Sequence, residues 1–228
     1  MTFGSPCQDY SLSGNQKGAK WTCQECGHEY NPLVVHYTVR NKCPVCGSAK
    51  LEKTRSSLLV EAMRILHEKK PIFGLFENVK NLVGSQFKET FDMFVNELQE
   101  YGYNTYYKVL NAKDFKVPQS RERLYLIFIK KDIDNGLFKF PTGFKDDVKL
   151  EDILLDEVPR NFYISEEQMK RFITELNSKD ALLFDPMQVK RDGRSREYND
   201  YCPTLAARDY KDPRLIKATE LNKRRIVK

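Results

Sequence analysis

Four cysteines near the start of the chain limit its fold more than any other feature. Cys23 and Cys26 form one Cys-x-x-Cys pair, Cys43 and Cys46 form a second, and 16 residues separate the two pairs. This spacing is typical of a structural zinc site, in which four thiolates leave no coordination position for a substrate. Two disulfides are the alternative, which a reducing compartment disfavours. We therefore expect a zinc ribbon over residues 20–52 that needs its structural zinc, because so short a segment lacks a core of its own.

The rest of the composition indicates a folded protein outside the membrane. The chain has 228 residues, enough for a buried core, and 40% of them are hydrophobic against 31% charged, which argues against a disordered chain. It contains no apolar run of about 18 residues that would span a bilayer. The first residues lack a basic stretch followed by an apolar one, so we expect no secretory signal and a cytoplasmic location.

The positive charge is concentrated at the C-terminal end. Residues 190–228 hold 12 Lys and Arg against 6 Asp and Glu, a surplus equal to the net charge of +6 for the whole chain. A basic segment of this kind favours contact with a polyanion such as nucleic acid. A solvated basic tail is the alternative.

Apolar patterning predicts helices that alternate with strands. Residues 58–67 and 86–101 have one apolar face each at helical spacing, with Ser56 and Ser57 as N-cap candidates for the first helix. Short apolar runs at 72–76, 103–110 and 124–129 read as strands, the last of them buried on both faces. This alternation predicts an α/β sheet. The pattern weakens after residue 140, where we place a boundary at 140–145 and expect one further helix at 165–178.

Three short segments carry reactive side chains at strand edges. Pro6-Cys7 follows a very short strand, Glu77-Asn78 ends the strand at 72–76, and Gln119-x-Arg121-x-Arg123 precedes the strand at 124–129. Taken singly, each has an ordinary explanation: a buried thiol, a solvated carboxylate and a surface ion-pair ladder. Together they are more specific, because ligand sites of α/β sheets gather at the carboxyl ends of strands.

A thiol, an acid and guanidinium groups suit chemistry on a pyrimidine ring. A thiolate that adds to C6 of cytosine makes C5 nucleophilic enough to accept a methyl group. A carboxylic acid hydrogen-bonded to N3 provides an outlet for the added charge, and a guanidinium holds O2. Cationic neighbours also favour the thiolate form of the nucleophile.

At these residues the sequence resembles the DNA cytosine-5 methyltransferases. Pro6-Cys7-Gln8, Glu77-Asn78-Val79 and Gln119-x-Arg121-x-Arg123 match three motifs of that family in order. Residues 9–18 look like its mobile catalytic loop, and residues 53–59 look like the segment that closes the loop. The resemblance covers residues 3–140. It implies part of a Rossmann-like S-adenosylmethionine-dependent methyltransferase sheet, with the zinc ribbon inserted and an irregular C-terminal region.

The resemblance also implies a role for each matched residue. Cys7 would attack C6, Glu77 would bind N3, Arg123 would bind O2 with Arg121 nearby, and Asn78 would brace the Pro-Cys loop, with Gln119 as further support. Duplex DNA, with the target base flipped out, would be the substrate, and S-adenosylmethionine the methyl donor. Residues that would touch DNA or the flipped nucleotide are Ser13, Lys17, Arg55 and Thr204. Those that would border the donor are Pro6 and Leu58.

Parts of the family pattern are absent from the sequence. The glycine-rich Phe-x-Gly-x-Gly turn and the acidic residues that hold the donor are not found, nor is the closing Gly-Asn-Ser element. We therefore expect residues 1–140 to be a partial catalytic core and residues 141–228 to be the start of a basic target-recognition region. Such a chain would be one subunit of a split enzyme, a truncated reading frame or a decayed remnant. A complementary chain would supply the donor-binding half, and the chain alone would have little activity.

Two other functions compete with this prediction. One is a non-catalytic DNA-binding remnant built on the zinc ribbon and the basic segment. The other is an RNA cytosine-5 methyltransferase, which we rank lower because the sequence lacks the Cys-Phe-Thr element of the relative that acts on tRNA. For the ribbon, the alternatives are a device that stiffens the catalytic loop or extends it over DNA, and a tolerated surface insertion.

Overall fold

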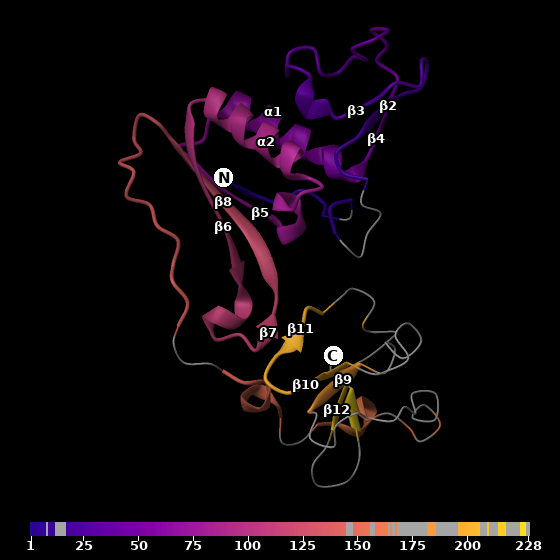
Figure 1. The fold of residues 1–228 in the computed structure, drawn as a ribbon, viewed down its shortest axis with the longest axis vertical. Helices are drawn as coiled ribbons and strands as arrows, with labels where there is room; N and C mark the ends of the chain where they lie inside the picture. The colour runs from indigo at the N-terminus through magenta and orange to yellow at the C-terminus, as the bar shows by residue number, and fades with distance from the viewer. Residues whose placement is uncertain are drawn as a thin grey trace. The chain divides into compact units, whose positions relative to one another are not determined.

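The computed structural model divides the chain into two units (Figure 1). The first comprises Met1–Leu110 with Glu122–Pro141, and the second comprises Asn111–Arg121 with Thr142–Lys228. The expected boundary at 140–145 stays a prediction; the second unit also takes the segment Asn111–Arg121. The residues that the structure describes are 1–7, 9–11, 17–144, 148–155, 158–163, 165, 167, 182–185, 196–205, 209, 214–217 and 224–226.

A four-stranded sheet forms the centre of the first unit. Its strands are, in order across the sheet, β1 (Thr2–Phe3), β5 (Phe73–Val79), β8 (Glu122–Lys130) and β6 (Tyr103–Asn111). β1 runs parallel to β5, and β8 runs antiparallel to β5. The connection between the parallel strands carries a helix, as a parallel pair requires. The α/β class is therefore confirmed. β5 continues three residues past the expected end at residue 76, so that Glu77 and Asn78 lie inside the strand.

Two helices bury their apolar faces in the core of this unit. They are α1 (Leu59–Lys69) and α2 (Lys88–Glu100), close to the predicted ranges. Phe94 of α2 packs on Phe76 of β5 with ring centroids 4.9 Å apart, and Phe91 of α2 meets Tyr107 of β6 at 4.8 Å. Among the described residues, no helix is both long and apolar enough to cross a bilayer.

The start of α1 differs from the prediction of a serine cap. The N-cap residue is Leu58, which makes no side-chain capping bond. Ser57 lies in a short 3-10 helix, η2 (Arg55–Leu58), and its hydroxyl donates to the carbonyl oxygen of Thr54 at 2.6 Å. The 3-10 turn moves the start of the α-helix one residue later and uses the serine hydroxyl locally.

The other face of the sheet is only partly covered. Phe73 at the start of β5 is 65% exposed, and every second side chain of β8 from Tyr125 to Ile129 is half-buried. The alternate side chains of β8, Leu124, Leu126 and Phe128, are fully buried. The prediction that residues 124–129 are buried on both faces is therefore wrong. Within the described part of the chain, α2 covers one face of the sheet, and the other face lacks a comparable layer.

A small zinc module, defined here as residues 20–52, lies between β1 and α1 in the sequence. Its strands β2 (Trp21–Cys23), β3 (Glu29–Tyr30) and β4 (Leu51–Lys53) form a sheet in the order β3-β2-β4. Trp21, Tyr30 and Leu33 belong to the same hydrophobic core as the helices. Figure 1 shows the module beside the ends of α1 and α2. The module thus shares the core of the first unit instead of standing apart.

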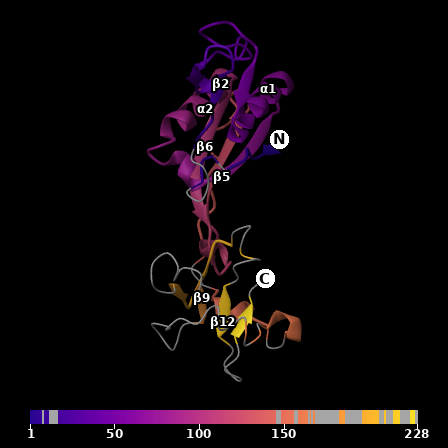
Figure 2. The same ribbon diagram turned by 90° about the vertical axis from the view of Figure 1, so that its right-hand side faces the viewer.

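The second unit is built from short strands. β9 (Leu183–Asp185), β10 (Arg196–Tyr198), β12 (Leu215–Lys217) and β13 (Arg224–Ile226) form a sheet in the order β10-β9-β12-β13. Figure 2 labels β9 and β12 of this sheet. β7 (Gln119–Ser120) pairs in parallel with β11 (Cys202–Pro203). A small core contains Leu150, Leu183, Cys202 and Ile216. The predicted helix at 165–178 lies outside the described residues, apart from residues 165 and 167.

Short 3-10 helices complete the connections. Besides η2, they are η1 (Pro32–Val34), η3 (Lys80–Val83), η4 (Ala112–Phe115), η5 (Leu150–Ile153) and η6 (Arg160–Phe162).

Candidate active site and zinc centre

Cys7 lies just past the end of β1, in a turn that fixes its backbone. The amides of Tyr10 and Ser11 both donate to the carbonyl oxygen of Cys7, at 3.0 Å and 2.8 Å. The Cys7 thiol is exposed. Asn78 on the neighbouring strand holds Ser5, two residues before Cys7, because its Nδ2 donates to the carbonyl oxygen of Ser5 at 3.1 Å and to the Ser5 hydroxyl at 2.9 Å. The nucleophile candidate is therefore presented to solvent on a tethered backbone.

Glu77 and Arg123 form an ion pair beside this turn. Arg123 Nε lies 3.1 Å from Glu77 Oε1, with the arginine side chain 18% exposed and the carboxylate 41% exposed. The register of β8 against β5 brings them together, since Val79 pairs with Arg123. On the other side, a Cβ at Gly4 would lie 3.6 Å from Glu77 Oε2, so the strand that leads to Cys7 passes directly beside the carboxylate. A thiol-bearing turn, an acid and a guanidinium thus lie on three adjacent strands or their ends.

The other residues of the arginine motif belong to the second unit. Gln119 is in β7, and the amide of Arg121 donates to Asn111 Oδ1 at 2.9 Å. Thr204 lies beside them, and its hydroxyl donates to the carbonyl oxygen of Ser120 at 2.8 Å. The hydroxyl proton of Thr204 is therefore engaged within the protein. The structure places Arg121, Gln119 and Thr204 in one unit, and Cys7, Glu77, Asn78 and Arg123 in the other.

Arg214 is a residue of the second unit that the sequence analysis missed. Its guanidinium is 11% exposed and lies 2.9 Å from Asp209 Oδ2 and 3.7 Å from Asp185 Oδ2. It also donates to the carbonyl oxygens of Pro203 and Thr204, at 3.4 Å and 3.2 Å. Arg214 thus orders the segment that pairs with β7. No short motif marks it, because its partners are single carboxylates and backbone carbonyl oxygens, at positions 5 to 29 residues before it.

The remaining predicted contact residues are at the surface or outside the described residues. Lys17 and Arg55 are exposed, Pro6 is half-buried and Leu58 is 53% exposed. Ser13 lies outside the described residues. Pro6 and Leu58 are the two residues that the sequence analysis assigned to the methyl donor. Both are apolar, so they could form only one side of a donor site.

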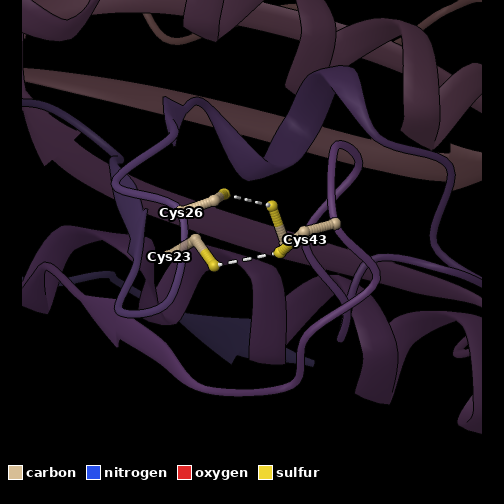
Figure 3. Close-up of side chains that lie close together, drawn as sticks. Cys23, Cys26 and Cys43 are labelled. Carbon is tan, nitrogen blue, oxygen red and sulfur yellow. Dashed lines mark hydrogen bonds between the residues drawn. The ribbon is translucent and has the colours of Figure 1, made fainter.

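The four cysteines of the zinc module form a compact cluster (Figure 3). Their sulfur atoms all lie within 4.8 Å of one another; the Cys23–Cys46 separation is 3.5 Å and the Cys26–Cys43 separation is 3.6 Å. A tetrahedral zinc with Zn–S bonds of about 2.3 Å places its sulfurs about 3.8 Å apart. The donor set and its spacing therefore fit a structural zinc ion.

The two cysteine pairs are built in the same way. The amide of Gly27 donates to the carbonyl oxygen of Cys23, and that of Gly47 donates to the carbonyl oxygen of Cys43, both at 2.9 Å. Both glycines have a positive φ, at 70° and 73°, which other residues adopt at a cost. The pKa of the Cys23 thiol is lowered to about 6; the backbone amide of Cys26 is the largest cause, burial opposes it, and the Glu25 amide adds to it. Such amides stabilise the thiolate form that binds zinc.

The module is fixed to α2 by a buried ion pair. Arg40 Nη2 lies 2.6 Å from Glu97 Oε2, and Arg40 Nη1 donates to Glu97 Oε1 at 3.2 Å. The two side chains are 4% and 8% exposed. Arg40 Nε also donates to the carbonyl oxygen of Val35 at 3.0 Å. A bidentate pair that is this deeply buried fixes the position of the module on the helix.

Comparison with known proteins places the chain among methyltransferases. The family model described as C-5 cytosine-specific DNA methylase matches residues 45–225, and one described as "Probable Treble clef zinc finger domain" matches residues 9–49. The orphan methyltransferase M.SPBetaI of Bacillus phage SPbeta is 30% identical over 207 residues, 78% of this chain and 47% of that protein. The type II methyltransferase M.SsoII of Shigella sonnei is 35% identical over 181 residues, 75% of this chain and 45% of that protein.

Solved structures include the methyltransferase EhMeth of Entamoeba histolytica. It aligns with a TM-score of 0.44 at 18% sequence identity and covers 78% of this chain and 46% of that one. The α/β sheet, the cysteine cluster and the two family models together define part of a methyltransferase fold with an inserted zinc finger. The chain belongs to the C-5 cytosine-specific DNA methylase family, whose methyl donor is S-adenosylmethionine. It spans less than half the length of the curated relatives named above.

Proposed function

We propose that this chain carries the nucleophile-bearing half of a DNA cytosine-5 methyltransferase. The reaction would transfer a methyl group from S-adenosylmethionine to C5 of cytosine in duplex DNA. The observation that carries the proposal is the pairing of Glu77 with Arg123 at 3.1 Å, beside the strand that leads into Cys7. These three groups match the three positions of a cytosine ring, C6, N3 and O2, that the chemistry must engage.

Each residue has a defined task in the reaction. The Cys7 thiolate forms a bond to C6, and the electron pair of the C5–C6 double bond moves towards N3 and O2. Glu77, in its protonated form, donates a hydrogen bond to N3, and Arg123 donates to O2, so that both stabilise the added charge. Bound S-adenosylmethionine supplies the methyl group that C5 takes up. C5 then gives its proton to a base, and the Cys7–C6 bond breaks to leave 5-methylcytosine and a free thiolate.

Duplex DNA would bind with the target base rotated out of the stack. A cytosine inside the helix cannot present C6 to a protein thiol, so the base must flip. Exposed Lys17 and Arg55, together with Ser13, would contact the backbone or the flipped nucleotide near the Cys7 turn. The basic segment 190–228 would add phosphate contacts from the second unit. This activity belongs in the cytoplasm, where a reducing environment also keeps the six cysteines out of disulfides.

We propose further that a complementary chain supplies the donor-binding half. β1 has one neighbour in its sheet, β5, within the described residues, which leaves its outer edge open to another strand. The half-exposed side chains on the face that includes Phe73 give such a partner an apolar surface to cover. Pro6 and Leu58 would then border the methyl donor.

Covalent trapping tests the proposal. The chain is mixed with the donor-binding portion of a relative such as M.SsoII, with S-adenosylmethionine and with duplex DNA that contains 5-fluorocytosine. The fluorine cannot leave C5 as a cation, so the Cys7 adduct persists and migrates as a larger band in a denaturing gel. We expect the band with the wild-type chain and with Cys202→Ala, and its loss with Cys7→Ala.

Other outcomes would decide between the competing functions. An adduct that survives Cys7→Ala, or methylation that needs no Cys7, contradicts the proposal. Trapping on tRNA that exceeds trapping on duplex DNA would make RNA the substrate. DNA binding by the chain with no adduct under any complemented condition would favour the non-catalytic alternative.

A further inference from the structure

Thr54 lies at the junction between the zinc module and the Cys7 turn. Its hydroxyl donates to the carbonyl oxygen of Gly18 and accepts from the amide of Lys20, both at 3.0 Å. Its own amide donates to the carbonyl oxygen of Lys20 at 3.0 Å. A single side chain therefore joins the residues on both sides of Ala19 to the segment that enters α1.

The same hydrogen bonds continue to the nucleophile. The amide of Gly18 donates to the carbonyl oxygen of Asp9 at 3.0 Å, and the amide of Tyr10 donates to that of Cys7. The segment that leaves Cys7 and the segment that returns are thus tied together at Asp9 and Gly18. Thr54 then links this Asp9–Gly18 contact to the segment that leads into α1.

In the other direction, the chain of contacts reaches a zinc ligand. Trp21 pairs with Lys53 in the β2–β4 ladder, and Cys23 pairs with Leu51 two residues further along. Trp21 is 1% exposed in the common core, and Lys53 Nζ lies 4.2 Å from the centre of its ring. A metal ion that binds Cys23 therefore stabilises the strand pair on which Thr54 depends.

We infer that Thr54 is a positioning residue, which couples the zinc module to the base of the loop that carries Cys7. Zinc stabilises the pairing of β2 with β4. Thr54, which directly follows β4, then holds Gly18 by a hydrogen bond. Gly18 in turn donates to the carbonyl oxygen of Asp9, two residues after Cys7. The inference rests on the proposed function only in so far as Cys7 is the nucleophile. A second anchor exists at Tyr10, whose ring packs on Phe87 at 5.2 Å and whose carbonyl oxygen accepts from Asn81. This anchor does not involve the module, so the contribution of Thr54 is separable from it.

Limited proteolysis measures this coupling without any need for methyl transfer. Trypsin can cleave after Lys17 and after Lys20, and mass spectrometry distinguishes these cuts from those elsewhere. In Thr54→Val, which keeps the side-chain shape but loses the hydroxyl, we expect the rate of cleavage at these two sites to rise at least fivefold. Thr54→Ser, which restores a hydroxyl, should return the rate to within twofold of wild type.

Thr22→Val is the matched control. Thr22 lies on β2 in the same module, and its hydroxyl makes only a long contact of 3.5 Å with Glu29 Oε1. We expect this variant to be cleaved at the wild-type rate. Removal of zinc from the wild-type chain with a chelator should reproduce the rise seen with Thr54→Val. Equal cleavage of Thr54→Val and wild type, or a rise as large in Thr22→Val, would overturn the inference.

The catalytic readout separates positioning from loss of fold. In the complemented enzyme, Thr54→Val should lower the rate of 5-fluorocytosine trapping at least tenfold at saturating DNA, with the DNA concentration for half-maximal trapping unchanged. Zinc content and the emission of the single tryptophan, Trp21, should match wild type. If Thr54→Val alters the zinc content or the Trp21 emission, the assay is repeated with Thr54→Ala, which also lacks the hydroxyl. Faster cleavage with normal trapping would overturn the coupling to Cys7 and leave the proposed function intact.

Discussion

Asn78 makes three hydrogen bonds from a side chain that is almost fully buried. Its Nδ2 donates twice to Ser5, and its Oδ1 accepts from the amide of Val79 at 2.8 Å. Only 2% of the residue is exposed, so water cannot replace these partners. The residue therefore links β5 to the segment that leads into Cys7, and it acts on the nucleophile only through the backbone.

Replacement of Asn78 tests that link. In Asn78→Ala, Ser5 and the amide of Val79 lose their partner, and we expect the free energy of unfolding to fall by about 1–3 kcal/mol. Urea unfolding measures this change. Asn135→Ala is the control, because Asn135 is exposed and only accepts from the amide of Leu137 in a turn. A stability loss as small as that of the control would contradict the role of Asn78.

α2 connects the two sides of the first unit. Its apolar side chains pack against the sheet, and Glu97 on the same helix pairs with Arg40 of the zinc module. Tyr101, just past the end of the helix, adds a hydrogen bond from its hydroxyl to Glu97. Burial, together with the charge of Glu97, raises the pKa of Tyr101 above its usual range, so the phenol stays protonated and continues to donate.

Variants of the buried pair test how the module is held. In Arg40→Met, the Glu97 carboxylate stays buried without its cation, and we expect a loss of about 3–5 kcal/mol. The double variant Arg40→Met/Glu97→Leu removes both charges and should be more stable than the single variant, because no uncompensated charge remains. Thermal unfolding of the zinc-loaded chain measures both. A double variant that is no more stable than Arg40→Met would contradict this account.

The sequence predicted the elements better than their contacts. The spacing of apolar residues was sufficient to predict α1 and α2, because in a helix with one buried face these residues recur every three to four positions. Strand β8 was misjudged, since an apolar run does not reveal whether one or two layers will cover it. Cys23, Glu77 and Arg123 were found because short motifs contain them. Arg40 and Thr54 were missed, because Glu97 and Gly18 lie far from them in the sequence and no local pattern records such pairs. Arg214 was missed although Asp209 is only five residues away, because no motif contains that pair.

At the scale of the whole molecule, one core of the first unit serves both the zinc module and the four-stranded sheet. Trp21, Tyr30 and Leu33 pack with Phe91 and other helix residues in a single cluster. The sequence suggested that the metal alone would hold the module together. The shared core adds a second source of stability, and it also makes the sheet depend on the module.

Removal of zinc should therefore affect more than the module. With a strong chelator, we expect the first unit to melt at a lower temperature, and the emission of Trp21 to shift to longer wavelength as its ring meets water. Far-UV circular dichroism and fluorescence measure these changes, and excess zinc should reverse them. An unchanged melting temperature in the chelated protein would show that the four thiols are dispensable for the fold.

The shared interior also limits how this finger can be transplanted. Residues 20–52 could be grafted into a relative that lacks such an insertion. The graft would bring three large buried side chains, Trp21, Tyr30 and Leu33, which need apolar pockets of matching shape in the recipient. The graft must also include the part of α2 that carries the buried Glu97, the partner of Arg40. The inserted finger and α2 must therefore be exchanged together. Exchange of either one alone would leave a cavity in the core or an unpaired buried charge.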